Sequence, residues 1–267
     1  ETPKEVSLRV RQNQTESWIV SGRGELHLSI LIENMRRQGY ELQVSKPEVI
    51  VKEIDGVPCE PYEDLQLEVP EENVGAVIEA LGTRGAEMIQ MTNHQNQVRL
   101  NYSIPSRGLI GFMTDYMTMT KGYGIINHTF STYKPMADAV VGERKLGVLV
   151  SMENGKASAY GLGQLEDRGV MFIEPGCEVY EGMIVGENNR ENDLAVNVVK
   201  QKQQTNTRSA GKDHTVVLKR PRKLSLEVCL DYINSDELVE VTPENFRMRK
   251  KILNTEERKK FDARKNS

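Results

Sequence analysis

The stretch LQLEVPEENVGAVIEALGTRGAEMIQMTNHQNQVRLNYSI, residues 65–104, indicates how the middle of the chain folds. Its first five residues alternate apolar and polar side chains, which predicts a strand with one buried face. Over 74–81 the apolar residues recur at the spacing of one helix face, and Gly82 ends that helix. Residues 88–91 and 98–104 then indicate two strands joined by a polar turn.

The residues on either side of this stretch complete an order of elements. We expect an extended connector at 47–53 and a turn at Asp55-Gly56 before it. A helix at 105–120 and a strand at 124–130 are expected after it. The order strand, helix, strand, strand, helix, strand predicts a ferredoxin-like sandwich over residues 47–134, with two helices on one face of an antiparallel sheet.

Residues 1–46 are expected to form a partial ferredoxin-like domain. Two short strands are predicted at 6–10 and 18–20, a helix opens at SGRGELHL, and residues 40–45 return as a strand. A complete sandwich needs one more strand and helix before these elements. The glycines around Arg23 lack the third glycine of GxGxxG and any GK[ST], which argues against a nucleotide-binding loop. Arg23 is interpreted as a surface contact or a local cap.

Residues 135–267 are predicted to form a β-rich domain, because short apolar strands alternate with turns. The strands are expected at 147–152, 157–160, 170–173, 178–180, 183–185, 193–199, 215–218, 237–241 and 246–248. Asn154-Gly155 is expected to be a hairpin turn, Ser225 to cap a short helix, and a frayed basic tail to begin at Thr255. The chain as a whole is assigned to the α+β class.

The stretch KQKQQTNTRSAGKDHTVVLKRPRK, residues 200–223, is called the basic segment here. It holds eight lysines and arginines against one acid, Asp213. Between residues 202 and 214 it has almost no apolar side chain, so it is expected to be an exposed loop on one long hairpin. A solvated hairpin tip and a loop that lies against phosphates and nucleotide edges are both compatible with this composition.

The distribution of charge favours a nucleic-acid partner, although the net charge of −4 does not. Residues 1–199 hold 18 Lys and Arg against 29 Asp and Glu, a balance of −11. Residues 200–267 hold 17 against 10, a balance of +7. Such asymmetry is typical of a protein with a local electropositive surface.

Composition excludes several other classes. The 267 residues suit two or three domains. No signal peptide is visible and no apolar run approaches the roughly 20 residues of a membrane span, so a cytoplasmic protein without membrane contact is expected. The histidines are scattered, so no metal site is predicted. The three cysteines are expected to be reduced thiols: Cys59, Cys177 and Cys229. Three methionines are expected to pack in the core, with a methionine-rich binding surface as the alternative: Met113, Met117 and Met119.

Six motifs carry a resemblance to a known family. They are SGRGELHLSILIENMRRQGYELQVSKPEV (21–49), IPSRGLIGFMTDYMTMTKGYGIINHTF (104–130), EDRGVMF (166–172), EVYEGMIVGE (178–187), NDLAVNV (192–198) and DELVEVTPENFRMRKK (236–251). Together they resemble translational GTPases of the TypA/BipA family over essentially the whole chain. The first two are shared in outline with elongation factor G and LepA, and the β-rich ending favours TypA/BipA.

The resemblance implies that the chain is the C-terminal part of a GTPase. The P-loop, GTP and Mg²⁺ are then expected in a preceding part, so this chain is expected to hold no cofactor and to have no enzymatic activity. No paired carboxylates or nucleophile–histidine spacing stands out, although a hydrolase built on Ser106 or Cys59 is the enzymatic alternative. The family serves large (50S) subunit assembly and stress adaptation, and binds the ribosome near its factor-binding centre.

The resemblance also implies that the basic segment approaches ribosomal RNA and the acceptor end of A-site tRNA. The candidate RNA contacts are Lys200, Lys202, Gln203, Gln204, Thr205, Asn206, Arg208, Ser209, Lys212 and His214. Weaker candidates for ribosome contact are Arg107, Arg23, Lys219, Arg220 and Arg222. A monomer is expected. The alternative function is a protein-interaction scaffold whose basic segment binds acidic protein surfaces.

Overall fold

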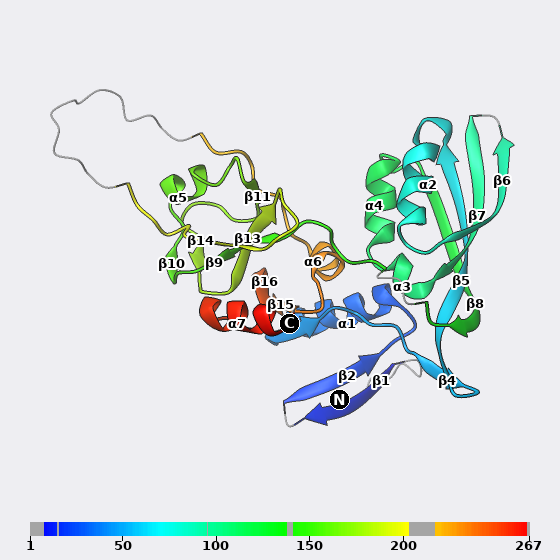
Figure 1. Cartoon of the computed structure of the whole chain (residues 1–267), viewed down its shortest axis with the longest axis horizontal. Helices are drawn as coiled ribbons and strands as arrows, with labels where there is room; N and C mark the ends of the chain where they lie inside the picture. The colour runs from blue at the N-terminus through cyan, green and yellow to red at the C-terminus, as the bar shows by residue number, and fades with distance from the viewer. Residues whose placement is uncertain (1–7, 15, 95, 138–140, 203–216, 266–267) are drawn as a thin grey trace. The chain divides into compact units, whose positions relative to one another are not determined.

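The chain forms two compact units, each built around a main sheet (Figure 1). The computed structural model describes residues 8–14, 16–94, 96–137, 141–202 and 217–265. The first unit draws on residues 1–30, 47–143 and 230–232, and the second unit draws on the rest. Both units mix strands with helices, which confirms the α+β class.

The sheet of the first unit is organised around β5 (Val57–Pro70). One edge of β5 pairs antiparallel with β7 (Gln97–Pro105), which in turn pairs with β6 (Glu87–His94). The other edge pairs antiparallel with β8 (Ile125–Pro135). A short hairpin joins β4 (Lys52–Ile54) to the start of β5. The strands therefore stand in the order β8-β5-β7-β6, with β4 beside the first residues of β5.

The β4–β5 hairpin turns where the sequence predicts it. Asp55 and Gly56 both have positive φ, 53° and 77°. Two consecutive residues of this kind are required by the two-residue turns that match the twist of a hairpin, and Asp-Gly adopts them readily. The predicted turn is confirmed, and the connector before it ends in a paired strand.

Helices of the first unit lie on one face of its sheet, with α2 (Val74–Gly82) beside α4 (Phe112–Met119) (Figure 1). A one-turn helix, η1 (Glu71–Asn73), precedes α2, and α3 (Ser106–Leu109) precedes α4. The single helix predicted at 105–120 is thus two, because Gly111 between them has a φ of 74° that no helix can continue.

The core of the first unit is the apolar layer between these helices and the sheet. Its fully buried side chains are Leu65, Leu67, Val69, Val77, Leu81, Leu100, Ile104, Phe112 and Tyr116. The interpretation of the three methionines as core side chains is wrong for two of them. Met113 and Met117 are 48% and 37% exposed, since they lie on the outer side of α4, whereas Met119 packs against the core.

The two strands at the start of the chain do not share a sheet with the strand at 42–45 that follows them. β1 (Arg9–Gln14) and β2 (Ser17–Ser21) pair with each other, and α1 (Glu25–Arg37) follows. The next strand, β3 (Leu42–Ser45), pairs antiparallel with β15 (Glu237–Val241) of the second unit. A partial sandwich over 1–46 predicts a different pairing. Apolar contacts favour the observed pairing of β3 with β15, because Leu42 and Val44 stand opposite the buried Val241 and Val239.

The sheet of the second unit has seven strands. Its main path is β14-β9-β13-β16-β15-β3, and β11 also pairs with β13. The β14–β9 pair is parallel and the other pairs are antiparallel. The strands not yet bounded are β9 (Val148–Ser151), β11 (Gly169–Met171), β13 (Met183–Asn188), β14 (Leu194–Val196) and β16 (Phe246–Lys250).

Three predictions for this region are wrong. Residues 157–160 lead into a helix, α5 (Ala159–Gly163), because Ser158 caps its first turn. Gly155 belongs to β10 (Gly155–Lys156), which pairs with β12 (Glu178–Val179), so no hairpin turns there. The tail after Asn254 is a helix, α7 (Thr255–Lys265), whose first turn is capped by the Asn254 side chain.

Other features of the second unit follow the sequence. Ser225 caps α6 (Leu226–Tyr232) by accepting a hydrogen bond from the Val228 N–H. Cys59 in the first unit, Cys177 in the second and Cys229 in α6 are all free thiols. Among the residues that the structure describes, no helix is long and apolar enough to cross a membrane.

Candidate nucleic-acid interface

The basic segment leaves the second unit just after β14. Val198 is fully buried and Val199 packs against the same core. The side-chain oxygen of Asn197 accepts hydrogen bonds from the N–H groups of Val199 and Lys200, each at 3.0 Å. This local turn directs the chain out of the core. Lys200 and Lys202 consequently stand exposed at its start.

Ser158, the capping residue of α5, holds this exit with both its backbone and its side chain. Its N–H donates to the Val198 carbonyl at 2.9 Å, and its hydroxyl donates to the Lys200 carbonyl. The same hydroxyl accepts the Gly161 N–H at 2.9 Å, which caps the helix. The start of the basic segment is therefore fastened to α5.

The end of the basic segment returns to the turn that follows α5. Leu218 packs against the core of the second unit. The Lys219 N–H donates to a carboxylate oxygen of Glu166 at 2.6 Å. Lys219 and Arg220 themselves are exposed. The predicted strand at 215–218 is not formed at its described residues, 217 and 218, which pair with no strand.

Arg222 lies at the same end but is engaged within the unit. Its guanidinium donates to the Glu187 carboxylate at 3.1 and 3.3 Å and lies over the Phe172 ring, 5.7 Å from its centroid. Its N–H donates to the Met171 carbonyl at 2.9 Å. This side chain secures the returning chain, and its charge is already paired.

Most of the predicted RNA contacts lie outside the described residues. These are Gln203, Gln204, Thr205, Asn206, Arg208, Ser209, Lys212 and His214. Within the described part of the chain, no ion pair engages Lys200, Lys202, Lys219 or Arg220, so their charges face solvent. These four unpaired cations thus lie at the two described ends of the basic segment, on a folded base.

The two candidates in the N-terminal half have different surroundings. Arg107 donates to both carboxylate oxygens of Glu60, at 2.6 and 3.1 Å, and to the Ala137 carbonyl at 2.8 Å. Glu60 is fully buried, so this pair ties α3 to β5 and engages the guanidinium internally. Arg23 is exposed, and its backbone N–H donates to a ring nitrogen of His27 at 3.3 Å.

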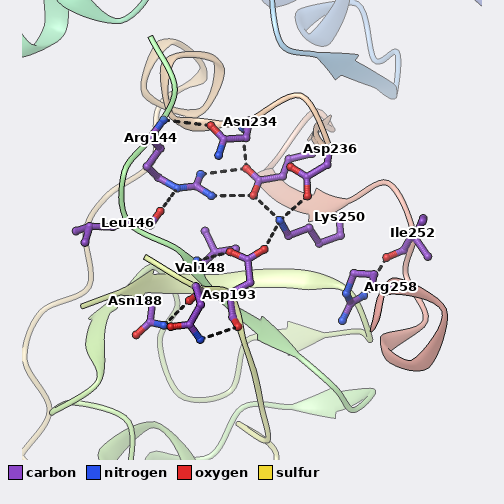
Figure 2. Close-up of polar contacts among 12 residues, drawn as sticks. Arg144, Leu146, Val148, Asn188, Asp193, Asn234, Asp236, Lys250, Ile252 and Arg258 are labelled. Atoms are coloured by element: carbon purple, nitrogen blue, oxygen red, sulfur yellow. Dashed lines mark hydrogen bonds and ion pairs between the residues drawn. The ribbon is translucent and has the colours of Figure 1, made fainter. Parts of the chain in front are cut away.

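A buried charge network in the second unit was not predicted (Figure 2). Glu237 is fully buried and accepts two hydrogen bonds from Arg144, at 2.9 and 3.0 Å. The ammonium group of Lys250 lies 2.8 Å from Glu237, 2.8 Å from Asp236 and 2.5 Å from Asp193. Three carboxylates thus surround one ammonium, and Arg144 adds a second cation.

The pKa values in this network follow from the pairing. Burial by itself raises the pKa of Glu237, but the hydrogen bonds from Arg144 and the charge of Lys250 outweigh it and lower that pKa overall. Burial by itself lowers the pKa of Lys250, and the charges of Glu237, Asp193 and Asp236 reverse the effect. Both groups are therefore charged at neutral pH.

The same carboxylates could be mistaken for a metal centre. Oxygens of Asp193, Asp236 and Glu237 lie within 4.8 Å of one another, close enough to share an ion. The Lys250 ammonium lies among them and supplies the positive charge. The arrangement is a structural ion cluster. Strand alternation places Glu237 and Lys250 on a buried face, which is the one sequence signal that could have revealed it.

Comparison with known proteins gives two domain families. Residues 146–255 match the TypA/BipA C-terminal domain, and residues 57–144 match the elongation factor G C-terminus. The basic segment lies entirely within the first match.

Several curated relatives match nearly the whole chain. Each carries the name large ribosomal subunit assembly factor BipA. The Bacillus subtilis protein is 63% identical over 98% of this chain, the Haemophilus influenzae protein 51% over 96%, and the Synechocystis protein 52% over 92%. The chain spans 43%, 42% and 41% of these three proteins.

Proposed function

We propose that this chain, which belongs to the TypA/BipA family, forms the ribosome-binding part of a translational GTPase that serves large-subunit assembly. One observation carries the proposal. Within the family's C-terminal domain, a segment with eight basic residues and one acid is fastened at both ends to the folded unit. A folded base with unpaired cations at each end suits a polyanionic partner.

The partner that fits this chemistry is RNA, both ribosomal RNA and A-site tRNA in the factor-binding region of the large subunit. Lysine and arginine neutralise phosphates and release counterions, which makes the affinity depend steeply on salt. Amide and hydroxyl side chains then set the register against backbone and exposed bases. In this proposal the contacts are Lys200, Lys202, Gln203, Gln204, Thr205, Asn206, Arg208, Ser209, Lys212 and His214.

Arg107 and Arg222 contribute little to binding in this proposal, because their guanidinium groups form internal ion pairs. Lys219 and Arg220 remain candidates at the far end of the segment. The first unit, whose βαββαβ order and strand order suit a ferredoxin-like fold, provides rigid spacing.

The catalytic step belongs to another part of the whole protein. GTP and Mg²⁺ would bind in a GTPase domain outside this chain, and this chain would bind and position the protein on the ribosome. The protein would act in the cytoplasm, including under stress.

Sedimentation of the chain with purified large subunits over a salt series tests the proposal. The variant Lys202→Ala/Arg208→Ala/Lys212→Ala is compared with a control, Lys121→Ala/Lys145→Ala/Lys251→Ala, which removes three exposed lysines elsewhere. The slope of log affinity against log salt should become shallower by up to about 0.9 per lost phosphate contact in the first variant only. Equal slopes in both variants would refute RNA contact by these residues, and salt-independent binding would favour a protein partner.

A further inference from the structure

We propose that Ser158 and Glu166 are positioning residues, which hold the two ends of the basic segment at fixed places on α5 and the turn after it. The inference rests on the proposed function, since it concerns how the same segment meets RNA. Neither residue carries a positive charge, and neither is assigned a phosphate or base contact. Their action is through the backbone of Lys200 and Lys219.

The first anchor is rigid because α5 lies directly against the chain that leaves β14. A Cβ atom at Gly161 would come within 2.5 Å of the Val198 carbonyl oxygen, so only glycine permits this approach. Ser158 completes the contact with hydrogen bonds to the carbonyls of Val198 and Lys200. The exit of the basic segment therefore moves only if α5 moves.

The second anchor belongs to the same rigid piece. The Leu162 N–H donates to the Ser158 carbonyl at 3.0 Å, and the Leu165 N–H donates to the Leu162 carbonyl at 3.0 Å. Leu162 and Leu165 are both buried in the core of the second unit. Glu166 follows directly and accepts the Lys219 N–H. Residues 158–166, which form one helix with its cap and the following turn, thus carry both contact points.

Fixing both ends has a physical consequence for binding. Lys200 and Lys219 are held in place before the segment meets RNA, so bringing these two ends together costs no further entropy on binding. Removing one anchor should weaken binding by about three- to tenfold, the scale of one hydrogen bond. Because no phosphate contact is removed, the salt slope should stay the same.

The experiment uses the whole protein and compares affinity and salt slope for large subunits. Ser158→Ala and Glu166→Ala remove the anchors, whereas Glu166→Gln keeps an acceptor oxygen and should restore most of the affinity. Two controls match them. Ser225→Ala removes a helix cap of the same kind on α6, and Glu181→Ala removes a carboxylate that likewise accepts a backbone N–H, from Thr255 at 2.7 Å.

The positioning role is supported if the two anchor variants lose affinity at unchanged slope while the controls, with equal thermal stability, bind normally. It is overturned if the anchor variants bind as the wild type does, if the controls lose as much, or if the slope falls as well. The Lys202/Arg208/Lys212 alanine variant separates the two ideas. If its slope matches the wild type, the proposed function fails. If its slope is shallower and the anchor variants bind normally, positioning alone fails.

Discussion

Truncation of Glu237 should destabilise the second unit more than any exposed charge substitution. Its carboxylate accepts hydrogen bonds from Arg144, from Lys250 and from the Asn234 N–H at 2.9 Å, and it is fully buried. Glu237→Ala leaves two buried cations without their shared partner, and breaking a buried pair costs about 3–5 kcal/mol. Lys250 keeps Asp193 and Asp236, so we expect a loss in the free energy of unfolding of about 3–4 kcal/mol.

Urea unfolding followed by circular dichroism measures this loss, and hydrogen exchange of the β15 and β16 amides assigns it to the second unit. Glu256→Ala is the control, because its partner Lys259 is exposed and such pairs contribute about 0–1 kcal/mol. Glu237→Gln, which keeps the volume and one acceptor, should fall between the two. If Glu237→Ala costs no more than Glu256→Ala, then the network does not stabilise the fold and our reasoning is wrong.

Three further outcomes are expected. Arg107→Ala leaves the buried Glu60 unpaired and should cost about 3 kcal/mol by urea unfolding, with Arg107→Lys losing less. Gly169→Ala should detach β11 from β13, seen as rapid exchange of β11 amides, because a Cβ there would overlap the Glu187 carbonyl oxygen. The hydrogen bond to Glu63 raises the pKa of His128, so the pair's stabilisation is full below the unfolded pKa of about 6.5 and is lost as pH rises through the higher folded pKa. His128→Gln should remove that decline from melting temperatures measured across pH, and an unchanged pH profile would contradict it.

Local pattern was sufficient where neighbours in sequence are also neighbours in space. The alternation of Leu65, Leu67 and Val69 predicted β5 and its buried face, and the Asp55-Gly56 turn followed from backbone chemistry. The basic segment was recognisable from composition alone, because a run of charge with few apolar residues cannot bury a face.

Local pattern failed where a distant partner decided the outcome. Met113 and Met117 have the spacing of an apolar face, yet they lie exposed on α4 because Phe112 and Tyr116 occupy the core side. Residues 157–160 read as a strand, but the Ser158 cap and the close approach of Gly161 to Val198 favour a helix.

The α+β class, the order of elements in the first unit, the TypA/BipA resemblance and the position of the basic segment could all be predicted from the amino-acid sequence. Three features became visible only in the folded chain: β3 pairs with β15, Lys250 joins Asp193, Asp236 and Glu237, and both ends of the basic segment contact α5 and the turn after it. The two groups of features differ in how far apart in the sequence the interacting residues lie. Turns and amphipathic faces depend on residues a few positions apart, whereas strand pairing and buried ion clusters join residues far apart in the chain, whose contacts no local spacing encodes.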